Sequence, residues 1–284
     1  MSAADTVVAR LRAAGCVFAE DEARLIREAA ATLEAVDAMV ERRVAGLPLE
    51  QLVGWAEFCG LRITLEPGVF VPRQRTGFLV STAIGLAVRS AADPVAGGEP
   101  ARAPIVVVDL CCGSGAIGAA LAERLGQDRT GQRSRRVELH ATDIDPAAVR
   151  CARRNVVAPH RVYQGDLFEP LPSGLHGRVD LLVANTPYVP TGAVELLPRE
   201  ARLHEPRVAL DGGPDGLALL RRIAAAAPQW LAPGGHLLIE TSEDQEIAAQ
   251  AAFTDNGLQA QVTRSAEQYA TVVVGTRLSV HEPA

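Results

Sequence analysis

The sequence contains no lysine, so all 28 of its basic residues are arginines. They are outnumbered by 34 acidic residues, which gives a formal net charge of −6 and a pI near 5.6. An acidic balance lowers the expectation of a nucleic-acid ligand without excluding one, because a local basic groove is compatible with it. Apolar residues make up 48% of the chain and charged residues 22%, as is typical of soluble globular proteins.

Cysteine is scarce and is not spaced for metal binding or disulfides. The five cysteines are Cys16, Cys59, Cys111, Cys112 and Cys151. They form no C-x-x-C pair and are odd in number, so neither a zinc site nor a disulfide framework is indicated, and we expect no metal centre. The sequence also lacks an N-terminal signal pattern and any apolar run of about 18 residues, which predicts a cytoplasmic protein without membrane spans.

The first part of the chain has a helical pattern. In residues 1–52, apolar side chains recur at a period of about 3.6 residues, with charged residues between them. Residues 55–73 resemble a short hairpin, and a helix is expected at about 76–89. We therefore predict an N-terminal domain, residues 1–75, and a second domain, residues 76–284. The Pro-, Gly- and Ala-rich segment 90–104 is the best candidate for a linker.

Beyond residue 104 the pattern changes to alternating strands and helices. Apolar runs predict strands at 105–110, 137–143, 161–166, 179–185, 234–241, 258–265 and 270–277. Helices fit at 115–125, 146–156, 214–229 and 244–254. This alternation is typical of an α/β protein with a doubly wound, mostly parallel sheet. A short connection joins the last two strands, which predicts that one of them is antiparallel.

A glycine-rich loop follows the first of these strands, where ligands of doubly wound sheets bind. Gly113, Gly115 and Gly118 form a G-x-G-x-x-G pattern. Such glycines allow positive φ and close approach to a ligand, and the next helix presents free N–H groups. The pattern alone is weak evidence, because a glycine-rich turn also serves simply to connect a strand to a helix.

The second and third strands end in carboxylates. Asp143 stands where a carboxylate accepts both hydroxyls of a ribose. Asp145 precedes a proline and is expected to cap a helix. Asp166 can accept from an adenine amino group, and Leu167 or Phe168 can cover the ring. These features predict an adenosine-containing ligand, either a nicotinamide dinucleotide or S-adenosylmethionine.

The fourth strand ends in Asn185, Thr186, Pro187 and Tyr188. Pro187 takes the chain out of the sheet, since it fixes the backbone and cannot donate a hydrogen bond. The Asn185 side-chain oxygen and the Thr186 carbonyl can then face the same cleft as the glycine-rich loop, beside the aromatic ring. Two convergent acceptors suit an NH2 group on a planar carbon, so these four residues are predicted to form the acceptor site of a methyltransferase.

Several motifs in this order resemble class I S-adenosylmethionine-dependent methyltransferases that carry an (N/D)-P-P-Y motif. They are RRVAGLPLEQLVGWAEFCGL, VFVPRQRTGFLV, DLCCGSGAIG, TDIDPAAVRCARRN, GDLF, ANTPY, HEPRVALDGGPDGL and LAPGGHLLIE. The resemblance runs through nearly the whole chain. It is strongest to the protein-(glutamine N5) methyltransferase family (HemK/PrmC), which modifies the glutamine of the Gly-Gly-Gln tip of class 1 peptide-chain release factors.

The resemblance implies the cofactor, the partner and the site residues. The cofactor is S-adenosylmethionine, and the partner is a release factor held by the N-terminal domain. Substrate contacts fall on the four residues that close the fourth strand. Cofactor contacts fall on Asp109, Cys111, Cys112, Gly113, Ser114, Gly115, Asp143, Ile144, Asp166, Leu167 and Asn185.

Three positions depart from the family pattern and indicate a divergent member. Thr186 replaces a proline, Cys111 replaces a glycine and Gly77 replaces a glutamate. The alternatives to glutamine methylation are an amino-methyltransferase of a nucleobase or small-molecule amine, a nicotinamide oxidoreductase, and a cofactor-binding protein without activity.

Two interactions outside these motifs are also expected. Arg73 either reaches the methionine carboxylate or pairs with an acidic neighbour. Glu205 and Arg207 are expected to form a local ion pair that orders the loop after the fourth strand.

Overall fold

The computed structural model describes residues 3–92, 103–127 and 136–279. The predicted linker at 90–104 lies mostly outside these ranges. Among the helices of the described ranges, none is long and apolar enough to pass through a membrane.

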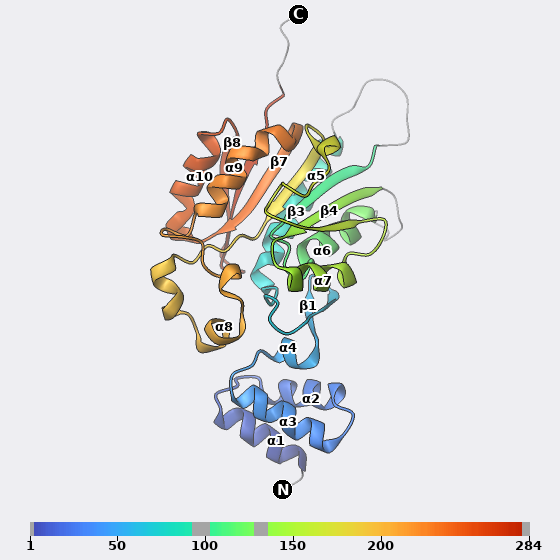
Figure 1. Ribbon diagram of the computed structural model, residues 1–284, viewed down its shortest axis with the longest axis vertical. Helices are drawn as coiled ribbons and strands as arrows, with labels where there is room; N and C mark the ends of the chain where they lie inside the picture. The colour runs from blue at the N-terminus through green and yellow to red at the C-terminus, as the bar shows by residue number, and fades with distance from the viewer. Residues whose placement is uncertain (1–2, 93–102, 128–135, 280–284) are drawn as a thin grey trace, which may run out of the picture.

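Four helices form the N-terminal end of the molecule: α1 (Ala3–Ala13), α2 (Ala19–Ala29), α3 (Leu33–Val44) and α4 (Leu49–Val53). The first three bury a small core of their own, which includes Leu11, Ile26 and Val40. Thr32 caps α3, because its side chain accepts a hydrogen bond from Ala35 N at 3.1 Å. Figure 1 shows these helices at the opposite end of the molecule from the C-terminus. The predicted helical character of residues 1–52 is confirmed.

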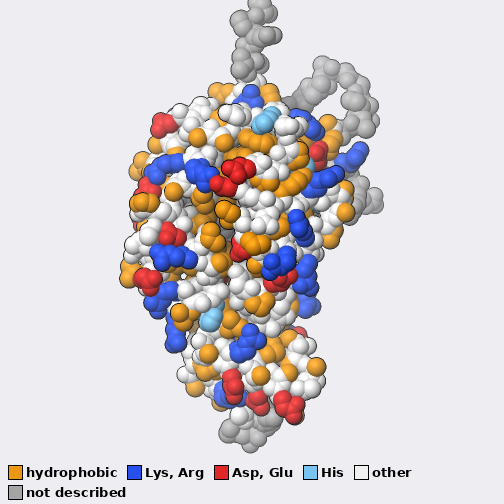
Figure 2. Space-filling view, viewed as in Figure 1, with side chains coloured by type: hydrophobic (Ala, Val, Ile, Leu, Met, Phe, Trp, Pro, Cys, Tyr) orange, Lys and Arg blue, Asp and Glu red, His pale blue; other side chains and the backbone are white. Residues whose placement is uncertain are grey.

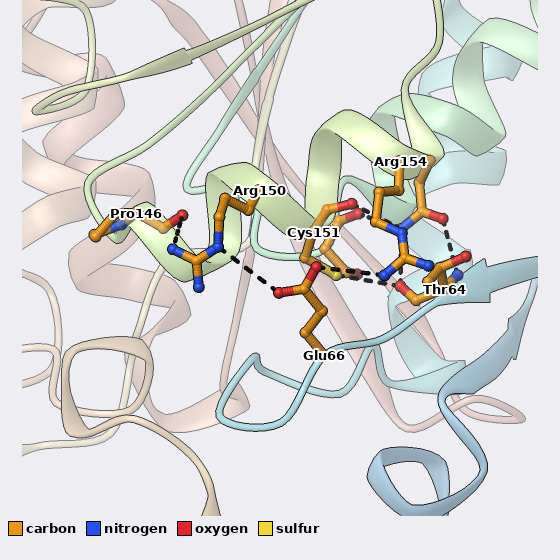
Figure 3. Close-up of polar contacts among 8 residues, drawn as sticks. Thr64, Glu66, Pro146, Arg150, Cys151 and Arg154 are labelled. Carbon is orange, nitrogen blue, oxygen red and sulfur yellow. Dashed lines mark hydrogen bonds and ion pairs between the residues drawn. The ribbon is translucent and has the colours of Figure 1, made fainter.

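A hairpin connects these helices to the rest of the chain. Its strands, β1 (Trp55–Phe58) and β2 (Leu61–Thr64), pair antiparallel. The hairpin packs on α7 (Pro146–Asn155), where Asn155 Oδ1 accepts from Thr64 N at 2.8 Å and Asn155 Nδ2 donates to Thr64 O at 2.9 Å. Figure 3 shows the polar contacts around this junction, made by Glu66, Arg150, Cys151 and Arg154.

Seven strands form the main sheet, in the order β5-β4-β3-β6-β7-β9-β8. Their bounds are β3 (Ile105–Leu110), β4 (Val137–Asp143), β5 (Arg161–Gln164), β6 (Val179–Ala184), β7 (Leu231–Thr241), β8 (Gln259–Ser265) and β9 (Ala270–Thr276). All neighbours pair parallel except β9, which is antiparallel to both β7 and β8. The predicted seven-stranded, mostly parallel sheet is confirmed.

Helices cover both faces of the sheet, and each face has its own core. On one face, α5 (Gly77–Ala92), α6 (Ala116–Gly126) and α7 pack around a core that contains Val107 of β3. On the other face, α9 (Ala218–Trp230) and α10 (Glu246–Thr254) pack around a second core. This core contains Val106 and Val108, the residues on either side of Val107 in β3. Because alternate side chains of a strand point to opposite faces, the continuous apolar run of β3 supplies both cores. Figure 1 shows the two helical layers.

The strand order reverses beside β3. The chain runs outward from β3 through β4 to β5, and then returns to place β6 on the other side of β3. Parallel pairing aligns Leu110, at the end of β3, with Ala184, at the end of β6. Cys111 and Asn185 therefore leave the sheet side by side, in the crevice where doubly wound sheets bind ligands.

The segment between β6 and α9 differs from the prediction. It contains η3 (Thr191–Leu196), α8 (Arg199–His204) and η4 (Arg207–Ala209), which the apolar pattern does not predict. α8 buries none of its side chains, so it has no apolar stripe to reveal it. The helix expected at 214–229 begins only at Ala218, because the glycines before it pack against other backbone segments.

We expect the side chain of Asn155 to contribute to the stability of the folded protein. Besides bridging Thr64, it donates to Ser114 O at 2.8 Å in the glycine-rich loop. Asn155→Ala removes the close partner of Thr64 N, Thr64 O and Ser114 O, so we expect the free energy of unfolding to fall by about 2 kcal/mol. The matched control is Asn256→Ala, which removes one bond to Ala252 O at a helix end and is expected to cost less than about 1 kcal/mol. Urea denaturation measures both, and equal losses would contradict the assignment.

Candidate active site

Three residues with positive φ fold the loop after β3. Cys111, Gly113 and Gly115 have φ angles of 55°, 55° and 78°. A side chain at Gly115 would place its Cβ 2.9 Å from Val156 Cγ2 and 3.2 Å from Ala152 Cβ, so glycine is required there. Cys111 adopts the left-handed conformation without the freedom of glycine, at a cost of about 1 kcal/mol. The loop therefore keeps its turn although one family glycine is replaced.

Asp109 lies beneath this loop. Its side chain is fully buried, and Oδ2 accepts a hydrogen bond from Gly118 N at 2.9 Å in α6. Its other oxygen, Oδ1, has no partner among the described residues. Burial raises the pKa of the carboxyl to about 7, against the Gly118 hydrogen bond, which lowers it. Asp109 therefore supports the start of α6 from below.

Asp143 joins two of the strand ends. Its Oδ2 accepts from Gly113 N at 2.8 Å, and its Oδ1 accepts from Asp145 N at 2.9 Å. Burial raises the pKa of this carboxyl, and the two backbone donors lower it. Asp145 caps α7, as its side chain accepts from Ala147 N at 2.8 Å, so the predicted capping role is confirmed.

The residues after β5 divide between the cavity and the core. Asp166 pairs with Arg222 of α9, with 2.7 Å between Oδ2 and Nη2. Leu167 has a φ of 49°, and its carbonyl accepts from the Thr142 hydroxyl at 2.9 Å. Phe168 instead stacks on Trp230, with ring centroids 5.2 Å apart. Of the two side chains predicted to cover a ring, Leu167 is therefore the one at the cavity.

The motif after β6 presents an unsatisfied acceptor. Asn185 Nδ2 lies 3.4 Å from Thr76 Oγ1, whereas Asn185 Oδ1 is buried and has no hydrogen-bond partner among the described residues. Thr186 is 2% exposed. The Tyr188 hydroxyl accepts a hydrogen bond from Arg75, whose guanidinium lies 5.8 Å from the centroid of the Tyr188 ring. Arg75 is not among the site residues predicted from the sequence.

A second glycine-rich segment braces the backbone of this motif. A Cβ at Gly212 would lie 2.5 Å from Pro187 O, and one at Gly216 would lie 2.2 Å from Tyr188 O. The side chain of Gln245, the residue that directly precedes α10, donates to Tyr188 O at 2.9 Å and so holds the same carbonyl. The HEPRVALDGGPDGL resemblance marked this segment without giving it a function. Its glycines are needed because backbone packs directly on backbone.

Arg73 pairs with an acidic neighbour. Its Nη2 lies 2.6 Å from Glu205 Oε2, and Glu205 Oε1 accepts from Val71 N at 3.3 Å. The expected Glu205–Arg207 pair is wrong, because Arg207 pairs with Asp211 at 3.3 Å. Glu205 is buried and is used to tie the loop after β6 to the segment before η1 (Gln74–Thr76).

These elements enclose one cavity of about 670 Å³, within the range of about 300–1,000 Å³ typical of cofactor sites. Asp109 and Gly115 lie outside its lining. Within the described chain, no group of three or more His, Cys, Asp or Glu residues is arranged to hold a metal ion. The predicted residues that line the cavity are Cys111, Cys112, Gly113, Ser114, Asp143, Ile144, Asp166, Leu167, Asn185, Thr186, Pro187 and Tyr188.

The lining suits an adenosine-containing methyl donor. Asp143 supplies a carboxylate for hydroxyl groups, and Ile144 and Leu167 supply apolar surface for a planar ring. Asp143 has no ion pair among the described residues, so its negative charge is free to favour a cation such as a sulfonium. The residues present therefore fit S-adenosylmethionine.

Comparison with known proteins identifies the family. Residues 100–213 match the family model "Methyltransferase small domain". A release factor glutamine methyltransferase of Geobacter sulfurreducens is 36% identical over 228 residues, 79% of this chain and 71% of the relative. Another, from Moorella thermoacetica, is 40% identical over 216 residues, 74% of this chain and 68% of the relative. The chain belongs to the release factor glutamine methyltransferase family. It is an S-adenosylmethionine-dependent methyltransferase.

Two further similarities bear on acceptor and fold. A 4-amino-L-phenylalanine/4-methylamino-L-phenylalanine methyltransferase of Streptomyces pristinaespiralis is 36% identical to this methyltransferase over 223 residues, 77% of this chain and 69% of the relative. A solved methyltransferase structure from Pyrococcus furiosus matches with a TM-score of 0.51 and 15% identity, over 86% of this chain and 98% of the other. The latter shows a shared fold, and the predicted class I methyltransferase fold is confirmed.

We expect the carboxylate of Asp143 to contribute to cofactor affinity. Asp143→Ala removes a charged acceptor, so we expect S-adenosylmethionine affinity to fall roughly tenfold or more, since such a hydrogen bond contributes about 1.5–3 kcal/mol. Asp145→Ala is the comparison, because it removes the α7 cap and is expected to lower stability by about 1 kcal/mol with a smaller change in affinity. Calorimetric titration measures both. Unchanged affinity in Asp143→Ala would refute the role.

Proposed function

We propose that this methyltransferase transfers a methyl group to the side-chain amide nitrogen of a protein glutamine, the Gln of the Gly-Gly-Gln tip of a class 1 peptide-chain release factor. The observation that carries the proposal is Asn185 Oδ1, which is buried beside the cavity without a partner among the described residues. A buried acceptor without a donor costs free energy. An NH2 group that enters the cavity supplies that donor.

The chemistry needs orientation more than proton transfer. A carboxamide nitrogen is a poor nucleophile because its lone pair is delocalised. S-adenosylmethionine, when bound, supplies a methyl group that its sulfonium already activates. Asn185 accepts from the NH2 group, holds the nitrogen in place and offsets the positive charge that develops on it. No residue has to act as a strong base, because the proton can leave after attack.

We further propose that residues 1–75 dock the release factor. The N-terminal helices are fixed beside the cavity, because Arg43 of α3 lies 2.7 Å from Glu22 of α2 and 3.3 Å from Glu200 of α8. Glu200 also lines the cavity. A protein held by these helices is therefore held next to the acceptor site. Translation termination is cytoplasmic, so the proposal includes that location.

The surface favours a protein partner over nucleic acid. On the face shown in Figure 2, basic and acidic side chains are interspersed. Nucleic-acid binding proteins typically gather basic residues in one patch or stripe.

One observation favours a second candidate, a small aromatic amine. The relative from Streptomyces pristinaespiralis, named for such an acceptor, is as similar to this chain as one of the release factor enzymes, at 36% identity in each case. An arylamine also presents NH2 on a planar carbon, so Asn185 suits both acceptors. Phe70, Leu197 and Val208 give the cavity an apolar wall for a ring.

Mass spectrometry after incubation with S-adenosylmethionine separates the two candidates. Release factor and 4-amino-L-phenylalanine are supplied in separate reactions. We expect one added CH2 on the Gly-Gly-Gln peptide of the release factor and none on the amine. Methylation of the amine alone would replace the proposal by the second candidate.

Asn185 is tested by substitution in the same assay. Asn185→Ala is expected to reduce transfer roughly 100-fold or more, as the loss of one well-placed polar group does in other enzymes, while cofactor affinity changes only a few-fold. Asn256→Ala, remote from the cavity, is expected to behave as the unsubstituted enzyme. Undiminished transfer by Asn185→Ala would contradict the assignment.

A further inference from the structure

Two consecutive residues of η1 reach the two polar side chains of the acceptor site. Thr76 Oγ1 lies 3.4 Å from Asn185 Nδ2, and Arg75 donates to the Tyr188 hydroxyl. Both η1 residues also interact with Glu240, a residue near the end of β7 that is 2% exposed. Arg75 Nε donates to Glu240 Oε1 at 3.2 Å. The buried carboxylate of Glu240 therefore interacts with both residues, Arg75 and Thr76, that contact the acceptor-site side chains.

The Thr76 hydroxyl lies within hydrogen-bonding reach of Glu240. Burial raises the pKa of Glu240, whereas the Thr76 hydroxyl, as a hydrogen-bond donor, and the Arg75 guanidinium lower it. Glu240 Oε2 is buried and has no partner at full hydrogen-bond geometry among the described residues. The hydroxyl proton of Thr76 thus has an unsatisfied acceptor close by.

The single proton of the Thr76 hydroxyl fixes the orientation of the Asn185 amide. The ion pair with Arg75 favours the ionised form of Glu240, which accepts hydrogen bonds and donates none. Toward Glu240, the Thr76 hydroxyl can act only as the donor, which uses its single proton. Its lone pairs remain for Asn185, which must therefore present Nδ2 to Thr76. Oδ1 is left without a partner in the described chain, as an acceptor for a substrate NH2 group.

The hydrogen-bond donors of Arg75 likewise fix the role of the Tyr188 hydroxyl. The guanidinium of Arg75 has donors and no acceptor, so the Tyr188 oxygen must accept from it. Burial raises the pKa of Tyr188, which keeps the phenol protonated. Its own O–H is therefore left to donate elsewhere. The acceptor site presents one acceptor and one donor of fixed identity.

We propose that Glu240 is a positioning residue that sets, through Thr76 and Arg75, the polarity that Asn185 and Tyr188 present to the methyl acceptor. The proposal rests on the proposed function, in which Asn185 Oδ1 accepts from the substrate NH2 group. With the amide reversed, Nδ2 would face that NH2 group and two donors would meet. Glu240 thereby acts on the reaction without touching the acceptor.

The orientation can be measured without any acceptor. The chain contains three asparagines, Asn155, Asn185 and Asn256, so protein labelled with 15N-asparagine gives three side-chain amide signals. The signal lost in Asn185→Ala identifies the residue. In Thr76→Val, which keeps the shape and removes the hydroxyl, we expect the Asn185 signal to shift and its amide protons to exchange with water several-fold faster. Those of Asn155 and Asn256 are expected to stay unchanged.

Two further variants keep this test independent of folding defects. Glu240→Gln can donate to Thr76, which frees the hydroxyl to reverse, so it is expected to affect the Asn185 signal as Thr76→Val does. Thr271→Val, at a buried threonine of β9, is the matched control and is expected to leave the Asn185 signal in place. An unchanged Asn185 signal in both Thr76→Val and Glu240→Gln overturns the proposal.

Kinetics then test the consequence for transfer. With whichever acceptor the enzyme methylates, Thr76→Val is expected to lower kcat roughly 10- to 100-fold with unchanged S-adenosylmethionine affinity, and Thr76→Ser to restore it. Equal losses in Thr76→Val and Thr271→Val would mean a packing role and overturn the proposal. Absence of release factor methylation by the unsubstituted enzyme would instead contradict the proposed function, and leaves the amide measurement valid.

Discussion

Parallel pairing of β3 with β6 is the constraint on which the active site depends. These strands are far apart in the sequence, and their register places Leu110 beside Ala184. The glycine-rich loop and the Asn185 motif therefore begin at neighbouring points of one sheet edge. A shift of this register by one residue would exchange the faces of β6 and remove its side chains from their cores. The apolar burial of both faces thus also secures the distance between the methyl donor and acceptor sites.

Charge is balanced around the cavity. Arg73 pairs with Glu205, Arg75 with Glu240 and Arg222 with Asp166. Each arginine at the cavity wall is thereby neutralised by a carboxylate, whereas Asp143 is held by backbone N–H groups. Such a lining suits an uncharged acceptor and a cationic methyl donor. A guanidinium holds a carboxylate and a second acceptor in fixed directions, as Arg75 does with Glu240 and Tyr188.

Much of the fold and site could be predicted from the sequence, because local rules specify them. The apolar run of β3 and the alternating pattern of β4 gave strands with the observed bounds. Asp143, Leu167 and Asn185 were found because each closes a strand. Arg75, Glu240 and Gln245 were missed, since their roles arise from contacts between segments more than 50 residues apart. α8 was missed because it has no buried face.

The central claim is that the side-chain amide of one glutamine enters the cavity beside Asn185. Transfer of labelled methyl from S-adenosylmethionine to a release factor, compared with the same factor carrying alanine in place of the Gly-Gly-Gln glutamine, tests it most directly. We expect label in the first protein and none in the second. Equal label in both, or none in either while the enzyme binds its cofactor, would contradict it.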